Sequence, residues 1–149
     1  AKFETGMDNF TINNITLPSD LSFVWKHDTT NKYMKASAFK KPTNYAAESR
    51  LTSPAFSLAG KTTATLSFKH AARFFANAAN EFKVQVSTDG TTWYDVAVSA
   101  YPTGNDWKFI DATCNLSAYA GNATVYIGFL YTSTATKAGT WEIKDVEVK

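Results

Sequence analysis

Residues 82–93 constrain the fold of this chain more than any other segment. Phe82, Val84 and Val86 alternate with polar residues, which is the period-two pattern of a strand with one buried face. Asp89-Gly90 then supplies a tight turn, because glycine tolerates positive φ and aspartate can hydrogen-bond its own backbone. The residues that follow begin with an aromatic side chain and have strand character again. The segment therefore predicts a β-hairpin.

Similar short segments, separated by turn-forming clusters, occur along the whole chain. Strands at this spacing are typical of an antiparallel sandwich or barrel, so we expect an all-β fold. No segment has a sustained helical period, and Ala71–Asn80, which is Ala-rich enough for a helical turn, is interpreted as a long loop. The expected strands are Phe10–Ile15, Leu21–His27, Tyr33–Phe39, Ser49–Thr52, Thr63–His70, Phe82–Ser87, Tyr94–Ser99, Trp107–Cys114, Thr124–Tyr131 and Thr140–Val148.

The last of these strands contains a break in its pattern. Trp141 and Ile143 share one phase, whereas Val146 and Val148 share the other. An extra residue in one strand changes which face the following side chains reach. We therefore expect a β-bulge near Lys144-Asp145.

Length and composition set limits on partners and location. The 149 residues fit one domain, and we treat 1–149 as a single module. A net charge of +2 and scattered lysines disfavour a nucleic-acid partner. No apolar run approaches the roughly 20 residues that span a bilayer, so membrane insertion is not expected. The first residues have no signal-peptide character, which leaves a cytoplasmic protein or a module excised from a larger exported protein. The Thr- and Asn-rich composition favours the exported module, secreted or displayed on a cell surface.

Five short motifs, in order along the chain, resemble those of one family. The family is the choice-of-anchor J domains of bacterial surface proteins, which are relatives of the cleaved-adhesin and MAM-like modules. The resemblance implies an antiparallel β-sandwich of jelly-roll type, whose relatives include carbohydrate-binding modules. Two positions depart from the pattern, because lysine replaces an acid at Lys69 and again at Lys144. The motifs are LTSPAFSL (51–58), LSFKHA (66–71), VSTDGTTW (86–93), LSAYAG (116–121) and GTWEIKDV (139–146).

Aromatic side chains suggest how such a module could recognise a ligand. A flat ring can stack on the apolar face of a sugar while nearby polar groups bond its hydroxyls. Trp93, Trp141 and Tyr119 lie inside the family motifs, so we expect them to pack the sandwich. Other aromatic and polar residues lie at strand ends or in loops, and we interpret them as candidate ligand-binding residues. They are Trp25, Tyr45, Glu48, His70, Arg73, Phe74, Phe75, Asn80, Tyr101 and Trp107.

Three of these candidates also have a structural interpretation. Phe74 and Phe75 are adjacent, and extended backbone cannot turn both rings inward, so one of them should be exposed. His70 shares its strand phase with Leu66 and Phe68, which favours a buried structural histidine. Its position just before the Phe74-Phe75 loop keeps a ligand role open.

The resemblance also implies a structural calcium ion between the first and last strands. Hard cations prefer several oxygen ligands, and Glu4, Asp8 and Asp145 are the candidate carboxylates. Lys144 stands where the family has one of two paired acids, which weakens such a site.

Catalytic motifs are absent from the sequence. The chain has two histidines, no Gly-x-Ser-x-Gly elbow and no phosphate-binding loop, although paired carboxylates among its 13 acids stay open. We therefore expect a non-catalytic module that binds a plant or dietary polysaccharide and targets covalently linked catalytic or surface domains to it. The alternative is a protein-binding adhesin or a structural spacer.

Overall fold

The computed structural model describes residues 1–149 and contains twelve strands, one short α-helix and one 3-10 turn. The helix α1 (Ala78–Glu81) has four residues, so no helix of this chain could cross a bilayer. The strands are β1 (Thr11–Thr16), β2 (Trp25–Asp28), β3 (Tyr33–Ser37), β4 (Phe39–Lys40), β5 (Thr43–Asn44), β6 (Glu48–Thr52), β7 (Thr65–Arg73), β8 (Phe82–Ser87), β9 (Tyr94–Val96), β10 (Ile110–Asn115), β11 (Tyr126–Thr132) and β12 (Thr140–Val148).

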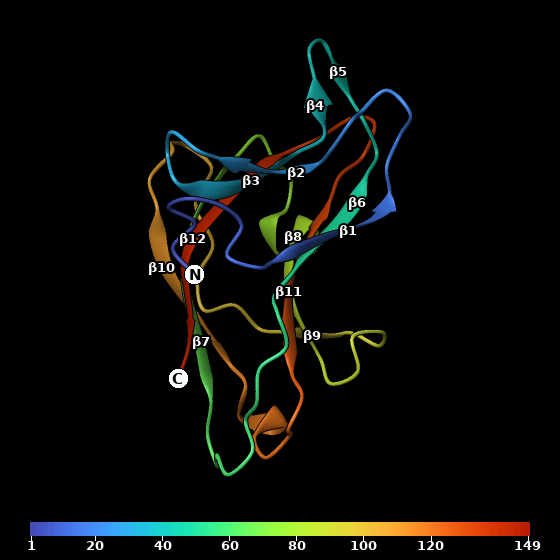
Figure 1. Ribbon diagram of the computed structural model, residues 1–149. Coiled ribbons are helices and arrows are strands. Elements are labelled where there is room, and N and C mark those ends of the chain that lie inside the picture. The colour runs from blue at the N-terminus through green and yellow to red at the C-terminus, as the bar shows by residue number, and fades with distance from the viewer.

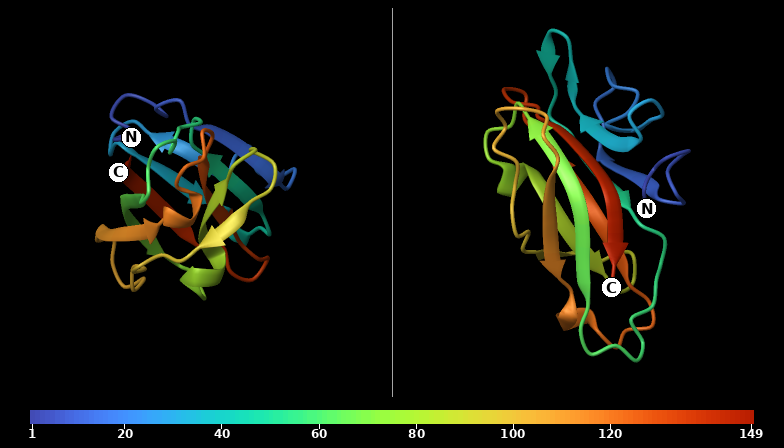
Figure 2. Two further views of the ribbon diagram at one scale, coloured as in Figure 1. Left: turned by 90° about the horizontal axis from the view of Figure 1, so that it is seen from below. Right: turned by 90° about the vertical axis from the view of Figure 1, so that its left-hand side faces the viewer.

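Ten of the strands form two antiparallel sheets that pack against each other (Figures 1 and 2). Sheet A has the order β1-β6-β11-β8-β9, and sheet B has the order β10-β7-β12-β3-β2. Strands β4 and β5 form a separate hairpin that projects from the upper end of the molecule in Figure 1. Most neighbours in the two sheets are distant in sequence, as in a jelly roll, whereas β2–β3 and β8–β9 are consecutive. The predicted antiparallel β-sandwich is confirmed.

The inward-facing residues of both sheets form one hydrophobic core. The ring of Trp141 on β12 stacks on Phe82 of β8, with centroids 5.1 Å apart, and joins the two sheets. Phe68 of β7 meets Phe129 of β11 edge-to-face, with centroids 5.2 Å apart, and this pair is a second aromatic contact between the two sheets. Aromatic pairs of this geometry contribute about 0.5–1.5 kcal/mol beyond the area they bury.

The hairpin and the bulge that the sequence predicts are both confirmed. Strands β8 and β9 pair antiparallel, with Gln85 opposite Asp95. The Asp89 carboxylate caps the turn between them by accepting the backbone N–H groups of Thr91 and Thr92 at 2.8 Å. In β12 the register against β7 shifts between Lys144 and Glu147, and Asp145 has a φ of 53°.

The segment 71–80 differs from its predicted structure. It was expected to be a long loop, but β7 continues to Arg73 because Ala71 and Ala72 pack fully buried in the sheet. A helical turn then follows, whose N-cap is Asn77: its side-chain oxygen accepts the backbone N–H of Asn80 at 3.2 Å. The loop is thereby reduced to residues 74–77.

Candidate functional site

Four aromatic side chains are exposed around one end of sheet B and follow one another across it. We call them the aromatic row: Phe23, Phe39, Phe74 and Trp107, with 46%, 47%, 55% and 39% of their surfaces exposed. Phe23 and Phe39 line one groove of about 260 Å³, and Phe39 and Phe74 line the next, of about 320 Å³. The rings of Phe74 and Trp107 meet edge-to-face with centroids 6.0 Å apart. Exposed apolar side chains that adjoin in this way are typical of a binding surface.

The row is assembled from four separate parts of the chain. Phe23 precedes β2, and Phe39 begins β4 in the hairpin that projects in Figure 1. Phe74 follows β7, and Trp107 precedes β10. Strand alternation explains why Phe39 faces outward, since Met34, Ala36 and Ala38 before it are buried on the opposite phase.

Phe74 is held outward by its backbone. Its φ of 65° lies in the left-handed region. This conformation costs about 1–3 kcal/mol for a residue other than glycine, and residues that adopt it cluster at functional sites. Phe75 turns the other way, and its ring lies edge-on to Phe82 at 5.6 Å. Gly139 makes room for it, because a Cβ there would lie 3.2 Å from the Cβ of Phe75 and 2.8 Å from the Phe82 ring. The prediction that one of the two adjacent rings is exposed is confirmed.

Arg73 supplies hydrogen-bond donors to the row. Its guanidinium carbon lies 4.9 Å from the centre of the Phe74 ring and 5.9 Å from that of Trp107, within range of cation–π attraction. Its Nε is buried and has no hydrogen-bond partner. A buried donor without an acceptor costs about 1–3 kcal/mol, so this nitrogen is suited to a ligand oxygen.

The groove between Phe39 and Phe74 is lined by polar side chains as well. Asn44 is already engaged, since its side-chain oxygen accepts the backbone N–H of Ala138 at 3.1 Å. Thr136, Lys137 and Thr140 also line the groove. Apolar rings beside hydroxyl and ammonium groups form the mixture that sugar recognition requires.

Three of the predicted ligand residues, Arg73, Phe74 and Trp107, are thus brought together. Two others are corrected by the structure. Trp25 is 1% exposed, because its ring packs 5.6 Å from that of Trp141 and its Nε1 donates to the Ser49 carbonyl at 3.0 Å. A side chain enclosed between the sheets cannot be a surface platform.

His70 is also a core residue. Trp141 Nε1 donates to its Nδ1 at 3.1 Å, so its Nε2 carries the proton and donates to the Ala100 carbonyl at 2.9 Å. Burial lowers the pKa of His70 to about 4, since desolvation disfavours the charged ring. The neutral imidazole fixes Trp141 and the loop at Ala100, and its surface is fully buried.

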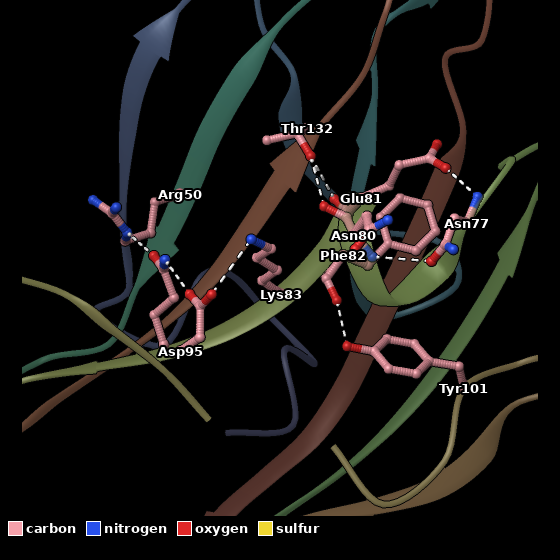
Figure 3. Close-up of polar contacts among 10 residues, drawn as sticks. Arg50, Asn77, Asn80, Glu81, Phe82, Lys83, Asp95, Tyr101 and Thr132 are labelled. Carbon is pink, nitrogen blue, oxygen red and sulfur yellow. Dashed lines mark hydrogen bonds and ion pairs between the residues drawn. The ribbon is translucent and has the colours of Figure 1, made fainter. Parts of the chain in front are cut away.

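The remaining predicted residues lie outside the grooves of the row. Phe75 packs inward as described. Tyr101 is half-buried and donates its hydroxyl to the Phe82 carbonyl at 2.7 Å, as Figure 3 shows. Tyr45 packs against the core, and Glu48 is half-buried at the start of β6. Asn80 is exposed in α1, where its carbonyl lies 3.3 Å from the Thr132 hydroxyl (Figure 3).

The predicted calcium ligands are not gathered into a cluster. Asp8 accepts the backbone N–H of Phe3 at 2.8 Å, and no three Asp, Glu, His or Cys side chains converge anywhere in the structure. Glu4, Asp8 and Asp145 therefore provide no three-carboxylate set, and the calcium ion stays a prediction.

A second polar arrangement lies on the outer face of sheet A. Arg50 Nε donates to the Gln85 side-chain oxygen at 3.0 Å, and the Gln85 amide nitrogen donates to Asp95 at 2.8 Å (Figure 3). Lys83 completes the chain as an ion pair with Asp95 at 3.3 Å. Trp93 covers Arg50 from outside the sheet, with its ring 4.3 Å from the guanidinium carbon. The expectation that Trp93 packs between the sheets is therefore wrong, whereas Trp141 does so and Tyr119 packs half-buried against the core.

No protein-family model matches the sequence, and a search of curated proteins also finds no match. Among solved structures, a CBM4 structure has a TM-score of 0.58 at 18% identity, covering 99% of this chain and 98% of that chain. A cleaved adhesin domain of Lys-gingipain from Porphyromonas gingivalis has a TM-score of 0.60 at 15% identity, covering 99% and 96%. The expected likeness to cleaved-adhesin and carbohydrate-binding jelly rolls is confirmed at the level of the fold. The chain has the β-sandwich fold of these modules.

Sequence reasoning missed Phe23 and Phe39 as members of the site. The phase of Phe39 against its buried neighbours was a usable signal. For Phe23 the sequence holds no comparable signal, since the buried Val24 and Trp25 follow it directly.

Proposed function

We propose that this chain is a non-catalytic carbohydrate-binding module that binds polysaccharide along the aromatic row. The observation that carries the proposal is the continuity of four exposed aromatic side chains, beside an arginine with an unpartnered donor. Sugar rings would stack on the aromatic faces, and Arg73, Thr136 and Lys137 would bond their hydroxyls. The fold that the chain shares with a CBM4 structure supports this reading.

In this role the module is secreted or displayed on a surface and keeps linked catalytic or surface domains near the polymer. A shallow surface site of this kind gives modest affinity, and tethering raises the effective concentration of the partner. A plant or dietary polysaccharide is the ligand class that we propose.

Affinity electrophoresis of the isolated chain tests the proposal against xylan, xyloglucan, mixed-linkage glucan, mannan and pectin. We expect one polymer to retard the protein, and Phe74→Ala or Trp107→Ala to abolish the retardation. Tyr94→Ala is the matched control, because Tyr94 is 54% exposed but lies on β9 at the edge of sheet A. Retardation that persists in both row variants and disappears in the control would contradict the proposed site.

A second candidate is a protein-binding adhesin or spacer, which the likeness to the gingipain domain favours. In that case no polysaccharide would retard the protein, and Phe74→Ala and Trp107→Ala would instead weaken a protein complex.

A further inference from the structure

Each member of the aromatic row has a basic side chain beside it. Lys26 lies 5.1 Å from the centre of the Phe23 ring, and Arg73 lies over both Phe74 and Trp107. Lys40 lines the groove between Phe23 and Phe39, and Lys137 lines the groove between Phe39 and Phe74. These side chains come from four different segments, so the fold concentrates positive charge that the sequence leaves scattered.

None of these four cations has an acidic partner within the chain. The three ion pairs of the structure join Lys69 to Asp111, Lys83 to Asp95 and Lys149 to Glu147. Among the four basic side chains of the row, only the Lys40 ammonium donates a hydrogen bond, to the backbone carbonyl of Asp20 at 3.2 Å. Only three of the 15 Lys and Arg side chains form ion pairs, so what distinguishes these four cations is their position around the aromatic row and not their lack of an acidic partner.

One acidic residue, Asp28, lines the grooves that contain the aromatic row, and its carboxylate is engaged locally. It lies with Phe23, Lys26 and Lys35 in a groove of about 370 Å³. Its two oxygens accept the backbone N–H groups of Thr30 and Asn31 and the Asn31 side-chain amide. These hydrogen bonds, chiefly the one from the Asn31 backbone, lower the pKa of Asp28. Asp28 therefore stays ionised, but its oxygens are occupied by turn donors and it forms no ion pair with the lysines of the row.

We infer that the ligand of the aromatic row is an acidic polysaccharide, one that carries carboxylate or sulfate groups along its chain. The inference rests on the proposed function and narrows its substrate class. The planar fork of Arg73 matches the geometry of a carboxylate or sulfate, and its buried Nε lacks an acceptor that such a group supplies. Lys26, Lys40 and Lys137 act as point charges that raise the association rate and select for negative charge.

The test compares polymers that differ in charge and share their linkage. Isothermal titration calorimetry would use polygalacturonate beside its carboxyl-reduced form, and dextran sulfate beside unsubstituted dextran. We expect an acidic polymer to bind about tenfold or more tightly than its neutralised counterpart, and its affinity to fall as salt rises, because exposed charges are screened. Preference for the carboxylate or the sulfate pair identifies which anionic group is recognised, and either preference supports the inference.

Variants separate the charge from the aromatic surface. Arg73→Gln and Lys137→Gln should each weaken binding of the acidic polymer about tenfold and weaken binding of the neutralised polymer by a smaller factor, because glutamine keeps a donor for hydroxyls and loses the charge. Lys61→Gln is the matched control, since Lys61 is exposed in the segment between β6 and β7 and lines none of the grooves of the row. Its affinity should equal that of the original chain.

Three outcomes would overturn the inference. Equal affinity for charged and neutralised polymers, lost in Trp107→Ala, would leave the carbohydrate-binding function standing and remove its acidic specificity. No binding to any polymer, in these pairs or in the neutral panel above, would remove the proposed function as well. Binding of single-stranded oligothymidylate as tight as that of the acidic glycan would assign the row to a phosphate backbone instead.

Discussion

Arg50 and Arg73 each lie over an aromatic ring, but their surroundings differ. On sheet A the guanidinium of Arg50 is stacked under Trp93, and its Nε is bonded to Gln85, which is bonded in turn to Asp95. At the end of sheet B, Arg73 lies beside Phe74 and Trp107, and its Nε has no partner. The first arrangement gives the arginine Nε an acceptor within the chain, whereas the second leaves an unpartnered Nε and exposed aromatic faces. The comparison teaches that hydrogen-bond satisfaction distinguishes a stabilising surface from a binding surface better than residue type does.

The comparison predicts opposite effects of one substitution at the two arginines. Arg50→Met removes the hydrogen bond to Gln85 and the guanidinium stacked under Trp93, so we expect a loss of about 2 kcal/mol in the free energy of unfolding with no change in glycan affinity. Arg73→Met removes the unpartnered Nε together with the cation–π contacts to Phe74 and Trp107, so we expect the free energy of unfolding to stay the same or rise by up to about 1 kcal/mol. Glycan binding should weaken about tenfold. Urea unfolding and calorimetric titration measure the two effects. Equal destabilisation by both variants would show that the arginines have the same role.

The buried His70 should make the free energy of unfolding depend on pH. Burial lowers the pKa of His70 to about 4, while the unfolded chain has a value near 6.5. The unfolded state therefore binds more protons between these values, and the free energy of unfolding falls as pH decreases from about 6.5 to 4. We expect a loss of about 2 kcal/mol between pH 7 and pH 4.5 from this group, measured by urea unfolding. His70→Gln should start from lower stability and flatten this part of the pH profile, and an unchanged slope in the variant would exclude His70 as its origin.

Phe74 and Phe75 offer the same comparison in two adjacent residues, because the first ring is exposed and the second packs inward. Phe75→Leu should cost about 1 kcal/mol, because the ring packs against Phe82 and over Gly139. Phe74→Gly should be neutral or stabilising by up to about 1 kcal/mol, since glycine adopts the φ of 65° without strain. Thermal unfolding measures both variants, and glycan binding should be lost in Phe74→Gly alone. Destabilisation by Phe74→Gly beyond about 1 kcal/mol would mean that the exposed ring supports the fold.

Local patterns in the sequence were sufficient for most of the fold. The alternation in β8 and the change of phase in β12 predicted a hairpin and a bulge, because side-chain period and turn chemistry are local properties. The β4–β5 hairpin and the continuation of β7 through Ala71 and Ala72 were missed. Alanine has little strand preference of its own, and burial between neighbouring strands determines its conformation here.

The candidate site was predictable only in part. Arg73 and Phe74 are adjacent in sequence, and their position at a strand end indicated a ligand role. Trp25 and His70 looked equally suitable, but their burial depends on rings contributed by distant strands. The grooves beside Phe39 exist because β4, β7 and the loop before β12 meet, which no single segment of the sequence encodes.

The smallest expected effect lies at the exposed end of the sheet A network. The pKa of Asp95 is lowered chiefly by the hydrogen bond from Gln85, and its ion pair with Lys83 is largely exposed to solvent. Exposed ion pairs contribute about 0–1 kcal/mol, and asparagine can still accept from Gln85. We therefore expect Asp95→Asn to lower the free energy of unfolding by less than about 0.5 kcal/mol in urea, well below the effect of Arg50→Met. If the two variants were equally destabilising, the stability of this face would depend on its charges and not on the buried stack of Arg50 under Trp93.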